Sequence, residues 1–597
     1  MGASMPLLPT SVEAGGARKR FRVVLVKPSH YDDDGYVIRW YRSPMPANSL
    51  ATVYGLIDDC AQRKVLGPGV DLDIVAIDET NTRVRVDRII KEMRANDNFG
   101  FVGLVGVQSN QYPRSLHIAK PLREAGIAVI IGGFHVSGML AMFPSLMGDL
   151  QQALDMGVTL FAGEAEGRMD EVMRDAAAGT LKPIYNYIND LPALEGSVTP
   201  FLPGNSVRKT IGNVTTFDAG RGCPFQCSFC TIINVQGRNS RYRSADDIEQ
   251  IVRENWRQRI AKYFITDDNF ARNAEWEAIF DRLAQLREVD GIPLGLMIQV
   301  DTMCHRIPNF IEKAKLAGVT RVFIGLENIN PDNLMASKKR QNKIIEYRKM
   351  LLAWKAQNVF VYAGYIVGFP GDTPESIRRD IGIIQRELPL DMLEFTMLTP
   401  LPGSEDHKVM WSKGVAMDPD LNNYDLEHVV VDHPTMTREE LQKVYEEAWS
   451  LYYTPEHVVT LLRRAAATKL PMMSFAKALV QFLTMMQLEK VHPLQSGLFR
   501  MKHPSERRPG LPREPALSFY LRHLARLVWR NAQLVGTTLW LLRLKRQIER
   551  DPNRLLYTDQ ALTPIGDHEE ETYDHLSKTA GAKAAIEHFK KVVALTH

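Results

Sequence analysis

Three cysteines lie within eight residues of one another in the segment Arg221-Gly-Cys-Pro-Phe-Gln-Cys-Ser-Phe-Cys230. Three residues separate Cys223 from Cys227, and two separate Cys227 from Cys230. Zinc and ordinary electron-transfer clusters usually take four protein ligands, so this spacing leaves one metal position free for another molecule. Two alternatives stay open: a zinc knuckle whose fourth ligand is a His or Cys304, and three incidental thiols.

The remaining composition excludes several classes of protein. Five cysteines, an odd number with three crowded together, form no disulfide framework, which indicates a reducing cytoplasm. The 73 basic and 70 acidic side chains nearly balance, so the net charge of +3 gives no reason to expect a nucleic-acid partner. No uninterrupted apolar run approaches the roughly 20 residues needed to span a bilayer.

Short β-branched runs alternate with helical stretches over residues 21–185, which predicts a parallel sheet with helices on both faces. The expected strands are FRVVLV, VDLDIVAI, FVGLVGV, AVIIGG and VTLFAGE. Ligands of such sheets bind at the carboxyl ends of the strands, near the switch point. The residues that we expect there are His30, Gln108, Ser109, Asn110, Gly132, Gly133, His135, Gly163, Glu164 and Glu166.

A second alternation begins near Val214, after a linker rich in Pro, Gly and Asn. Its six expected strands fit a partial β/α barrel better than a closed eight-stranded one, with catalytic groups at the carboxyl ends of the strands. Beyond about Met410 the strand pattern ends and the sequence is typical of helices. The expected α/β organisation is a disordered leader (1–20), a doubly wound domain (21–185), a linker (186–208), a partial (β/α)6 barrel (209–410), a helical region (411–577) and a tail (578–597).

The cysteine segment resembles the cluster loop of the radical S-adenosylmethionine superfamily. The resemblance implies a [4Fe–4S] cluster on the three cysteines, whose free iron is chelated by the amino and carboxylate groups of S-adenosylmethionine. Phe229 matches the aromatic residue placed beside the adenine. Thr266-Asp-Asp-Asn-Phe270 resembles a strand end whose carboxylates, Asp267 and Asp268, face the site. Gly325-Leu-Glu327 and Tyr365-Ile-Val-Gly368-Phe-Pro370 resemble strand ends that supply an acid, Glu327, and backbone contacts at Gly325 and Gly368.

Residues 21–185 resemble the cobalamin-binding domain of the class that includes methyltransferases and the anaerobic porphyrin cyclase. The similarity is carried by Val105-Gly-Val-Gln-Ser-Asn110, Gly132-Gly-Phe-His135, Gly163-Glu-Ala-Glu166 and, after the barrel, Thr399-Pro-Leu-Pro-Gly-Ser404. It implies cofactor contacts at Gln108, Ser109, Gly132, Gly133, His135, Gly163 and Glu164. The D-x-H-x-x-G signature is absent, so either cobalamin binds base-off without a protein histidine or it does not bind.

The two resemblances imply an enzyme that cleaves S-adenosylmethionine reductively and, with cobalamin, methylates an unactivated carbon. An electron donor such as flavodoxin or ferredoxin is then needed. The alternatives are radical oxidation or cyclisation without methyl transfer, and an iron–sulfur binding or electron-transfer protein. We also expect Arg221, Arg238 and Arg241 to favour thiolate formation by their charge, unless they are solvated loop residues.

The helical region carries a local excess of positive charge. Residues 490–550 contain thirteen Lys or Arg against three Asp or Glu. Arg522, Arg526 and Arg530 recur at helical spacing opposite Leu521, Leu524 and Val528. This pattern predicts an amphipathic helix lying on anionic lipid at the inner membrane surface, and a lipid-like substrate would suit it. The alternative is a cationic helix packed on acidic parts of the same chain.

Overall fold

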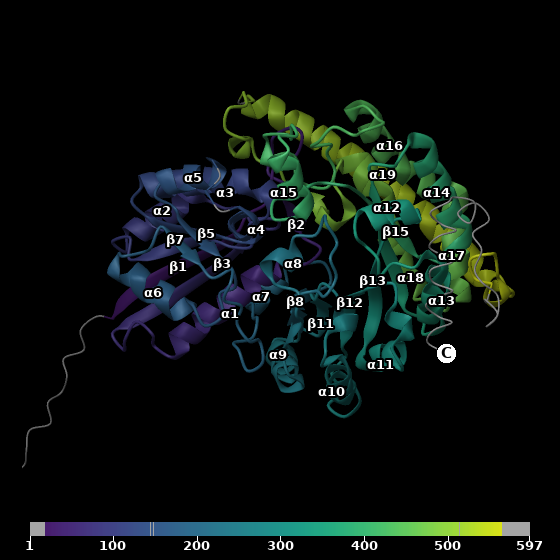
Figure 1. Cartoon of the computed structure of the whole chain (residues 1–597), viewed down its shortest axis with the longest axis horizontal. Coiled ribbons are helices and arrows are strands. Elements are labelled where there is room, and N and C mark those ends of the chain that lie inside the picture. The colour runs from purple at the N-terminus through teal and green to yellow at the C-terminus, as the bar shows by residue number, and fades with distance from the viewer. Residues whose placement is uncertain (1–17, 144, 147, 513, 564–597) are drawn as a thin grey trace, which may run out of the picture.

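The computed structural model describes residues 18–563 except 144, 147 and 513 (Figure 1). Most of the predicted leader and the whole predicted tail lie outside the described residues. Figure 1 shows the N-terminal domain beside a second α/β sheet, with C-terminal helices packed against the second sheet. No helix in the described part of the chain is long and apolar enough to cross a membrane.

The N-terminal domain contains a six-stranded parallel sheet of order β3-β1-β4-β5-β6-β7. Its strands are β1 (Lys19–Lys27), β3 (Val70–Asp78), β4 (Gly100–Leu104), β5 (Ala128–Gly132), β6 (Thr159–Ala162) and β7 (Ile184–Asn186). Its helices are α1 (Asn48–Gln62), α2 (Val86–Arg94), α3 (Tyr112–Glu124), α4 (Phe134–Met142), α5 (Gly148–Asp155) and α6 (Met169–Ala178). The predicted doubly wound fold is confirmed, with β7 as an additional strand.

Alternation along β1 explains why this sheet is covered on both faces. Val24 and Val26 belong to one apolar core, whereas Val23 and Leu25 belong to the core on the other side. The strand order reverses direction between β1 and β4, so the switch point lies between these two strands. The loops after β1 and β4 therefore open onto the crevice where such folds bind ligands.

The second sheet is also parallel, with the order β15-β14-β13-β12-β11-β8. Its strands are β8 (Val214–Phe217), β11 (Lys262–Ile265), β12 (Gly295–Val300), β13 (Val319–Glu327), β14 (Phe360–Val367) and β15 (Met392–Met397). The helices along this part of the chain are α7 (Gly204–Val207), α8 (Ile232–Val235), α9 (Ala245–Arg257), α10 (Trp276–Glu288), α11 (Phe310–Ala317), α12 (Pro331–Ala336), α13 (Tyr347–Ala356) and α14 (Pro374–Glu387). All six predicted strands are present, and the described sheet is open, with β8 and β15 at its ends.

Side-chain alternation gives the second sheet an outer and an inner face. Val322, Ile324 and Leu326 of β13 pack in the core beneath the helices. Because successive side chains of a strand point to opposite faces, Gly325 and Glu327 lie on the inner face. A short antiparallel pair, β9 (Gly220–Arg221) with β10 (Arg241–Tyr242), flanks the cysteine loop at the carboxyl end of β8.

The C-terminal region joins both sheets. Its helices are α15 (Glu405–Ser412), α16 (Arg438–Tyr452), α17 (Pro455–Ala467), α18 (Met472–Thr484) and α19 (Ala516–Arg550). Leu441, Leu461 and Phe475 of this region share one continuous core with the second sheet. β16 (Leu498–Arg500), which lies in a region expected to be helical, pairs antiparallel with β2 (Trp40–Arg42) of the N-terminal domain. The chain therefore closes back on its first domain.

Candidate cofactor site

The three predicted cysteine ligands lie together on the loop that links β9 to α8. Cys227 is buried, whereas Cys223 and Cys230 are partly exposed. The Cys230 backbone N–H donates to the Cys227 carbonyl at 3.2 Å, and the Cys223 N–H donates to the Gly237 carbonyl at 3.2 Å. The thiols are close enough that their charges act on one another. The loop thus presents three sulfur atoms at one end of the sheet.

The protein surroundings hold two of these thiols in the protonated form. Burial, together with the charge of Asp268, raises the pKa of the Cys223 thiol to about 11 and that of Cys230 to about 12. Since a thiolate is the metal ligand, metal binding at this loop must displace protons. The predicted help from Arg221 and Arg241 is not available, because carboxylates pair with both guanidinium groups.

The donor set fits an iron–sulfur cluster better than a single metal ion. Among the described residues, no three His, Cys, Asp or Glu side chains converge so as to hold one ion. In a four-iron cluster each cysteine binds a different iron, so the three sulfur atoms need not meet at one point. The zinc alternative therefore lacks support, while three thiols on one loop suit a cluster with one open iron.

An ion pair connects the predicted acid to the aromatic residue of the cysteine loop. Lys339 Nζ pairs with Glu327 Oε1, and it lies 5.8 Å from the ring centroid of Phe229. Gly325 leaves room for this pair, because a Cβ there would lie 2.6 Å from Glu327 Oε1 and 3.1 Å from Lys339 Nζ. Glu327 itself has a φ of 63°, a left-handed conformation that is costly for a residue with a side chain. The structure thus brings Glu327, Gly325 and Phe229 together, as predicted.

The segment after α12 completes this corner of the site, and sequence reasoning missed it. Gln341 Nε2 donates to Cys227 Sγ at 3.4 Å. Asn342 Nδ2 donates to the carbonyls of Gly325 at 3.0 Å and Leu326 at 2.8 Å. Lys339 and these two amides arise from the polar run Ser337-Lys-Lys-Arg-Gln-Asn342, which looks like an ordinary solvated turn. Only the fold shows that it covers the cysteine loop.

The remaining predicted positions of the second sheet have different roles. Asp267 accepts hydrogen bonds from the Ala219 N–H at 2.7 Å and from Asn273 Nδ2 at 3.1 Å, so it fixes the chain after β8. Asp268 is partly exposed, and its charge acts on the thiols of Cys223 and Cys230. Burial raises the pKa of each of these two aspartates to about 7. Asp268 is therefore the one of the pair that faces the cysteine loop.

Gly368 directly follows β14, and its backbone N–H has a hydrogen-bond partner within the protein. Its N–H donates to Asp372 Oδ2 at 3.0 Å, and its φ of 97° is a conformation that favours glycine. The backbone shape expected from the motif is therefore present.

The predicted residues of the N-terminal domain gather at the carboxyl edge of its sheet. Gln108 is exposed there. Gly133 and Gly163 both have positive φ, and a Cβ on Gly133 would lie 2.1 Å from the Val107 nitrogen. Gly132 lies against Phe161, whose carbonyl oxygen would be 3.2 Å from a Cβ on Gly132. Glycines thus let the backbone of two loops come close at this edge.

His135 is fully engaged within its own domain. Its Nδ1 lies 3.2 Å from Ser109 Oγ, its Nε2 lies 2.7 Å from Asp149 Oδ2, and the ring is buried against Tyr112. Both ring nitrogens therefore have partners, and neither is available to ligate a metal in this conformation.

Glu164 belongs to a buried network of charges between the two domains. Its Oε2 accepts from Arg221 Nη1 at 2.7 Å and from Arg241 Nη1 at 2.9 Å. Both carboxylate oxygens of Glu166 accept hydrogen bonds from the Arg221 guanidinium group, at 2.6 and 3.1 Å. Glu164, which the resemblance places beside a cofactor, thus pairs in this structure with two arginines across the domain boundary.

The same network continues into the second domain. Asp218 lies 3.2 Å from Arg221 Nε and 3.4 Å from Arg243 Nη2, and it accepts a hydrogen bond from Asn48 at 2.9 Å. Burial opposes ionisation of Glu166 and Asp218, but the charge of Arg221 lowers the pKa of both carboxyl groups below their usual range. Arg221, two residues before the first cysteine, therefore fixes the cysteine loop against the N-terminal domain.

The loop Thr399-Pro-Leu-Pro-Gly-Ser404 also lies between the domains. A Cβ on Gly138 of α4 would be 2.8 Å from the Gly403 Cα, so the two backbones pack directly. Asn234 Nδ2 donates to the Gly403 carbonyl at 2.9 Å, and the Asp406 N–H donates to the Ser228 carbonyl at 3.1 Å. This loop thus touches both the predicted cobalamin domain and the cysteine loop.

One further acid lies deep on the inner face of the second sheet. Glu394 of β15 is 4% exposed and pairs in register with Gly364 of β14. Burial, aided by the charge of Glu327, raises the pKa of Glu394 to about 8. Its Oε2 has no hydrogen-bond partner among the described residues. A neutral carboxyl group is therefore held within the sheet that carries the cysteine loop.

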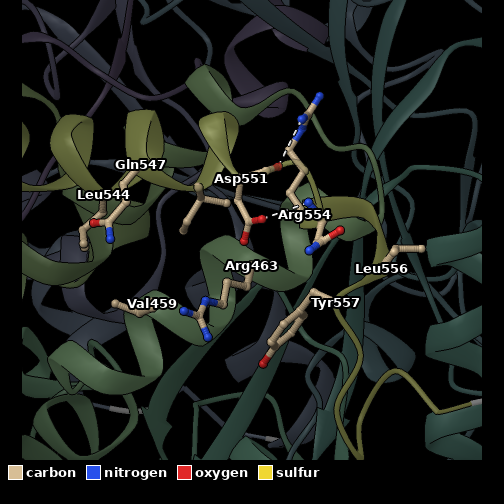
Figure 2. A pocket seen from close by; sticks show the side chains of 10 residues that line it. Val459, Arg463, Leu544, Gln547, Asp551, Arg554, Leu556 and Tyr557 are labelled. Carbon is tan, nitrogen blue, oxygen red and sulfur yellow. Dashed lines mark hydrogen bonds between the residues drawn. The ribbon is translucent and has the colours of Figure 1, made fainter.

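Two surface cavities lie away from these residues. One of about 660 Å³ lies between α17 and the C-terminal end of α19, where Arg463, Asp551 and Tyr557 line it (Figure 2). The other, of about 500 Å³, lies on the N-terminal sheet beside Arg22 and Arg83. Neither contains a predicted site residue, so the strand ends define the candidate site.

Comparison with known proteins agrees with this geometry. The family model described as Radical SAM superfamily matches residues 218–382. The chain is 25% identical over 332 residues to bacteriochlorophyllide d C-12(1)-methyltransferase of Chlorobaculum tepidum, covering 54% of this chain and 68% of that protein. It is 28% identical over 371 residues to hopanoid C-2 methylase of Rhodopseudomonas palustris, covering 58% and 64% of the two chains.

Solved structures also share this fold. The radical S-adenosylmethionine methyltransferase TsrM of Kitasatospora setae, with cobalamin and a [4Fe–4S] cluster bound, matches with a TM-score of 0.50 at 15% identity. The match covers 66% of this chain and 79% of that one. About two thirds of this chain therefore has a counterpart of known fold.

Removing Arg221 tests the buried network. We expect Arg221→Ala to lower the free energy of unfolding in urea by about 3 to 5 kcal/mol, because it leaves buried carboxylates without their partner. Arg253→Ala is the matched control, since its pairs with Glu249 and Asp290 are exposed and should contribute less than about 1 kcal/mol. Equal losses in the two variants would contradict a special role for the network.

Glu394 predicts a pH dependence of stability. Its folded-state pKa lies above the unfolded value, so the folded protein binds the extra proton and loses stability as pH rises from about 5 to about 8. In Glu394→Gln the free energy of unfolding should fall less steeply with pH, and the slopes should differ by at most about 1.4 kcal/mol per pH unit. Urea unfolding across this range measures the effect, with the exposed Glu446→Gln as control. An unchanged slope in Glu394→Gln would refute the prediction.

Proposed function

We propose, from the premise that this chain carries a radical S-adenosylmethionine domain at residues 218–382, that it is a cobalamin-dependent methyltransferase acting on an unactivated carbon. The observation that carries the proposal is the corner formed by the three thiols, Phe229 and the Glu327–Lys339 pair at the carboxyl end of the second sheet. The named methyltransferases that the chain resembles support methyl transfer as the outcome.

The residues of the second sheet would bind and orient S-adenosylmethionine. Cys223, Cys227 and Cys230 would hold the [4Fe–4S] cluster, and Phe229 would lie beside the adenine. Gly325 and Gly368 would supply backbone contacts, and Glu327, with Asp268, would face the cofactor and substrate. Lys339 balances the charge of Glu327. Its Nζ also lies 5.8 Å from the Phe229 ring centroid, so the ion pair lies near the aromatic residue. Phe229, Glu327 and Lys339 are only partly exposed, which helps to exclude water from a reactive species.

The edge of the N-terminal sheet would hold cobalamin. Gln108, Ser109, Gly132, Gly133 and Gly163 would contact it, and the glycines let the loops of this edge pack closely against one another. Because both nitrogens of His135 are engaged, cobalamin would bind without this histidine as the lower ligand. When bound, the cluster supplies an electron for cleavage of S-adenosylmethionine and cobalamin carries the methyl group.

The partners of this chemistry follow from its needs. A reductant such as flavodoxin or ferredoxin would supply electrons in the cytoplasm. The substrate would be a small or lipid-like molecule, and the relative named for hopanoid methylation makes the second class reasonable. The basic segment 490–550 would bring the enzyme to the inner membrane surface as a peripheral protein.

The cluster ligands provide the test of this function. We expect Cys227→Ala, reconstituted anaerobically with iron and sulfide, to lose both the visible absorbance of the cluster and 5′-deoxyadenosine formation on reduction with dithionite. Cys60→Ala is the matched control because Cys60 is buried in the N-terminal domain and should leave both signals intact. Retention of cluster absorbance or of S-adenosylmethionine cleavage in Cys227→Ala would overturn the assignment.

A further inference from the structure

The long helix α19 has two unlike faces. One face packs inward, where Phe519, Leu541 and Ile548 are buried. Arg530 lies on this side and pairs with Glu489, so it does not join an exposed basic face as the sequence pattern predicted. The opposite face is open, although it is apolar. Leu517, Leu521 and Val528 are 75%, 61% and 70% exposed.

The exposed apolar side chains form one continuous stripe. Its members are Leu517, Leu521, Leu524, Val528, Ala532, Val535 and Leu539, and all are exposed. They are separated by four, three, four, four, three and four residues, which keeps pace with the 3.6-residue turn of a straight helix. The stripe therefore runs straight for about 33 Å along one side of α19.

The straightness of the stripe distinguishes between two kinds of occupant. Pairing with a second helix as a left-handed coiled coil requires a seam that repeats every 3.5 residues. The stripe instead follows the 3.6-residue repeat of a straight helix. A straight apolar stripe can contact a flat surface along its whole length. Figure 1 shows α19 as one long unbroken helix along the upper part of the molecule.

The charges beside the stripe are of one sign. No Asp or Glu occurs between residues 516 and 548. Arg522 and Arg526 point away from the stripe, since they lie about 120° and about 160° around the helix from it, and they pair with Glu514 and Asp34. Beyond Leu539 the exposed Arg543 and Arg546 lie on the same side of α19 as the stripe. Anionic lipid would attract these two arginines, and no acidic side chain of α19 stands between them and the stripe.

Two aromatic side chains complete the pattern. Tyr520 and Trp529 lie beside the stripe and are 42% and 54% exposed. Amphipathic rings of this kind favour the headgroup level of a bilayer, where one end is apolar and the other is hydrated. Because α19 is not apolar enough to cross a membrane, these rings and the stripe suit a helix that lies in the interface.

We propose that α19 docks this protein onto an anionic phospholipid bilayer, with the stripe from Leu517 to Leu539 inserted below the headgroups and with Arg543 and Arg546 bound to lipid phosphates. This inference deepens the proposed function, on which it rests only in linking the bilayer to a lipid-like substrate. The docking itself depends on α19 and on no cofactor.

The test uses the full chain and vesicles of phosphatidylcholine mixed with phosphatidylglycerol. A triple variant, Leu521→Asp with Leu524→Asp and Val528→Asp, places charges in the stripe without touching the core. We expect its vesicle-bound fraction in sedimentation to fall at least about tenfold, because the buried apolar area is lost. The matched control is Val289→Asp with Leu316→Asp. Val289, directly after α10, and Leu316 of α11 are exposed apolar residues away from α19, so these changes should not affect binding.

The lipid and salt dependence complete the test. Wild-type binding should weaken in vesicles of phosphatidylcholine alone and at high salt, since screening reduces the attraction of the arginines. Undiminished binding of the triple variant would overturn the proposal, and so would a wild-type dimer in sedimentation velocity that the triple variant abolishes. Cleavage of S-adenosylmethionine is measured separately in solution. If the wild-type protein binds vesicles but does not cleave S-adenosylmethionine, the proposed function is refuted and the docking proposal is not.

Discussion

The buried pairing of Arg221 with Glu164 and Glu166 is the interaction on which the arrangement of the site depends. The two acids follow β6 of the N-terminal sheet, while Arg221 stands two residues before Cys223. Charges removed from water lose much hydration energy, and their mutual attraction repays this only when the geometry is close and every group is bonded. A network of this kind therefore contributes a defined position more than it contributes stability.

That position brings two ligand-binding edges together. The carboxyl edge of the N-terminal sheet, where Glu164 and Glu166 follow β6, faces the domain that carries the cysteine loop. The direct contact of Gly138 with Gly403 and the pairing of β2 with β16 hold the same two domains at further points. An enzyme that moves a methyl group between two cofactors needs both held in a fixed relation, because misplacement of reacting groups lowers the rate steeply.

Much of this organisation could be predicted from the sequence. The alternation of β-branched runs gave both parallel sheets, and the cysteine spacing with the acid and glycine motifs located Phe229, Gly325 and Glu327 at one corner. Lys339 escaped prediction because it lies twelve residues beyond Glu327 in an irregular polar run, and only tertiary folding pairs the two. Glu164 shows a different limit: a carboxylate at a strand end has the same sequence signal whether it meets a ligand or an arginine of another domain.

As proposed here, one chain uses a cluster and cobalamin together for methyl transfer. Anaerobic incubation of the reconstituted wild-type protein with S-adenosylmethionine, dithionite and cobalamin, followed by chromatography of the nucleosides, measures this most directly. We expect both 5′-deoxyadenosine and S-adenosylhomocysteine, because one molecule of S-adenosylmethionine is cleaved reductively and another gives up its methyl group. The appearance of 5′-deoxyadenosine alone would contradict methyl transfer and favour oxidation or cyclisation, and the absence of both nucleosides would contradict the radical chemistry itself.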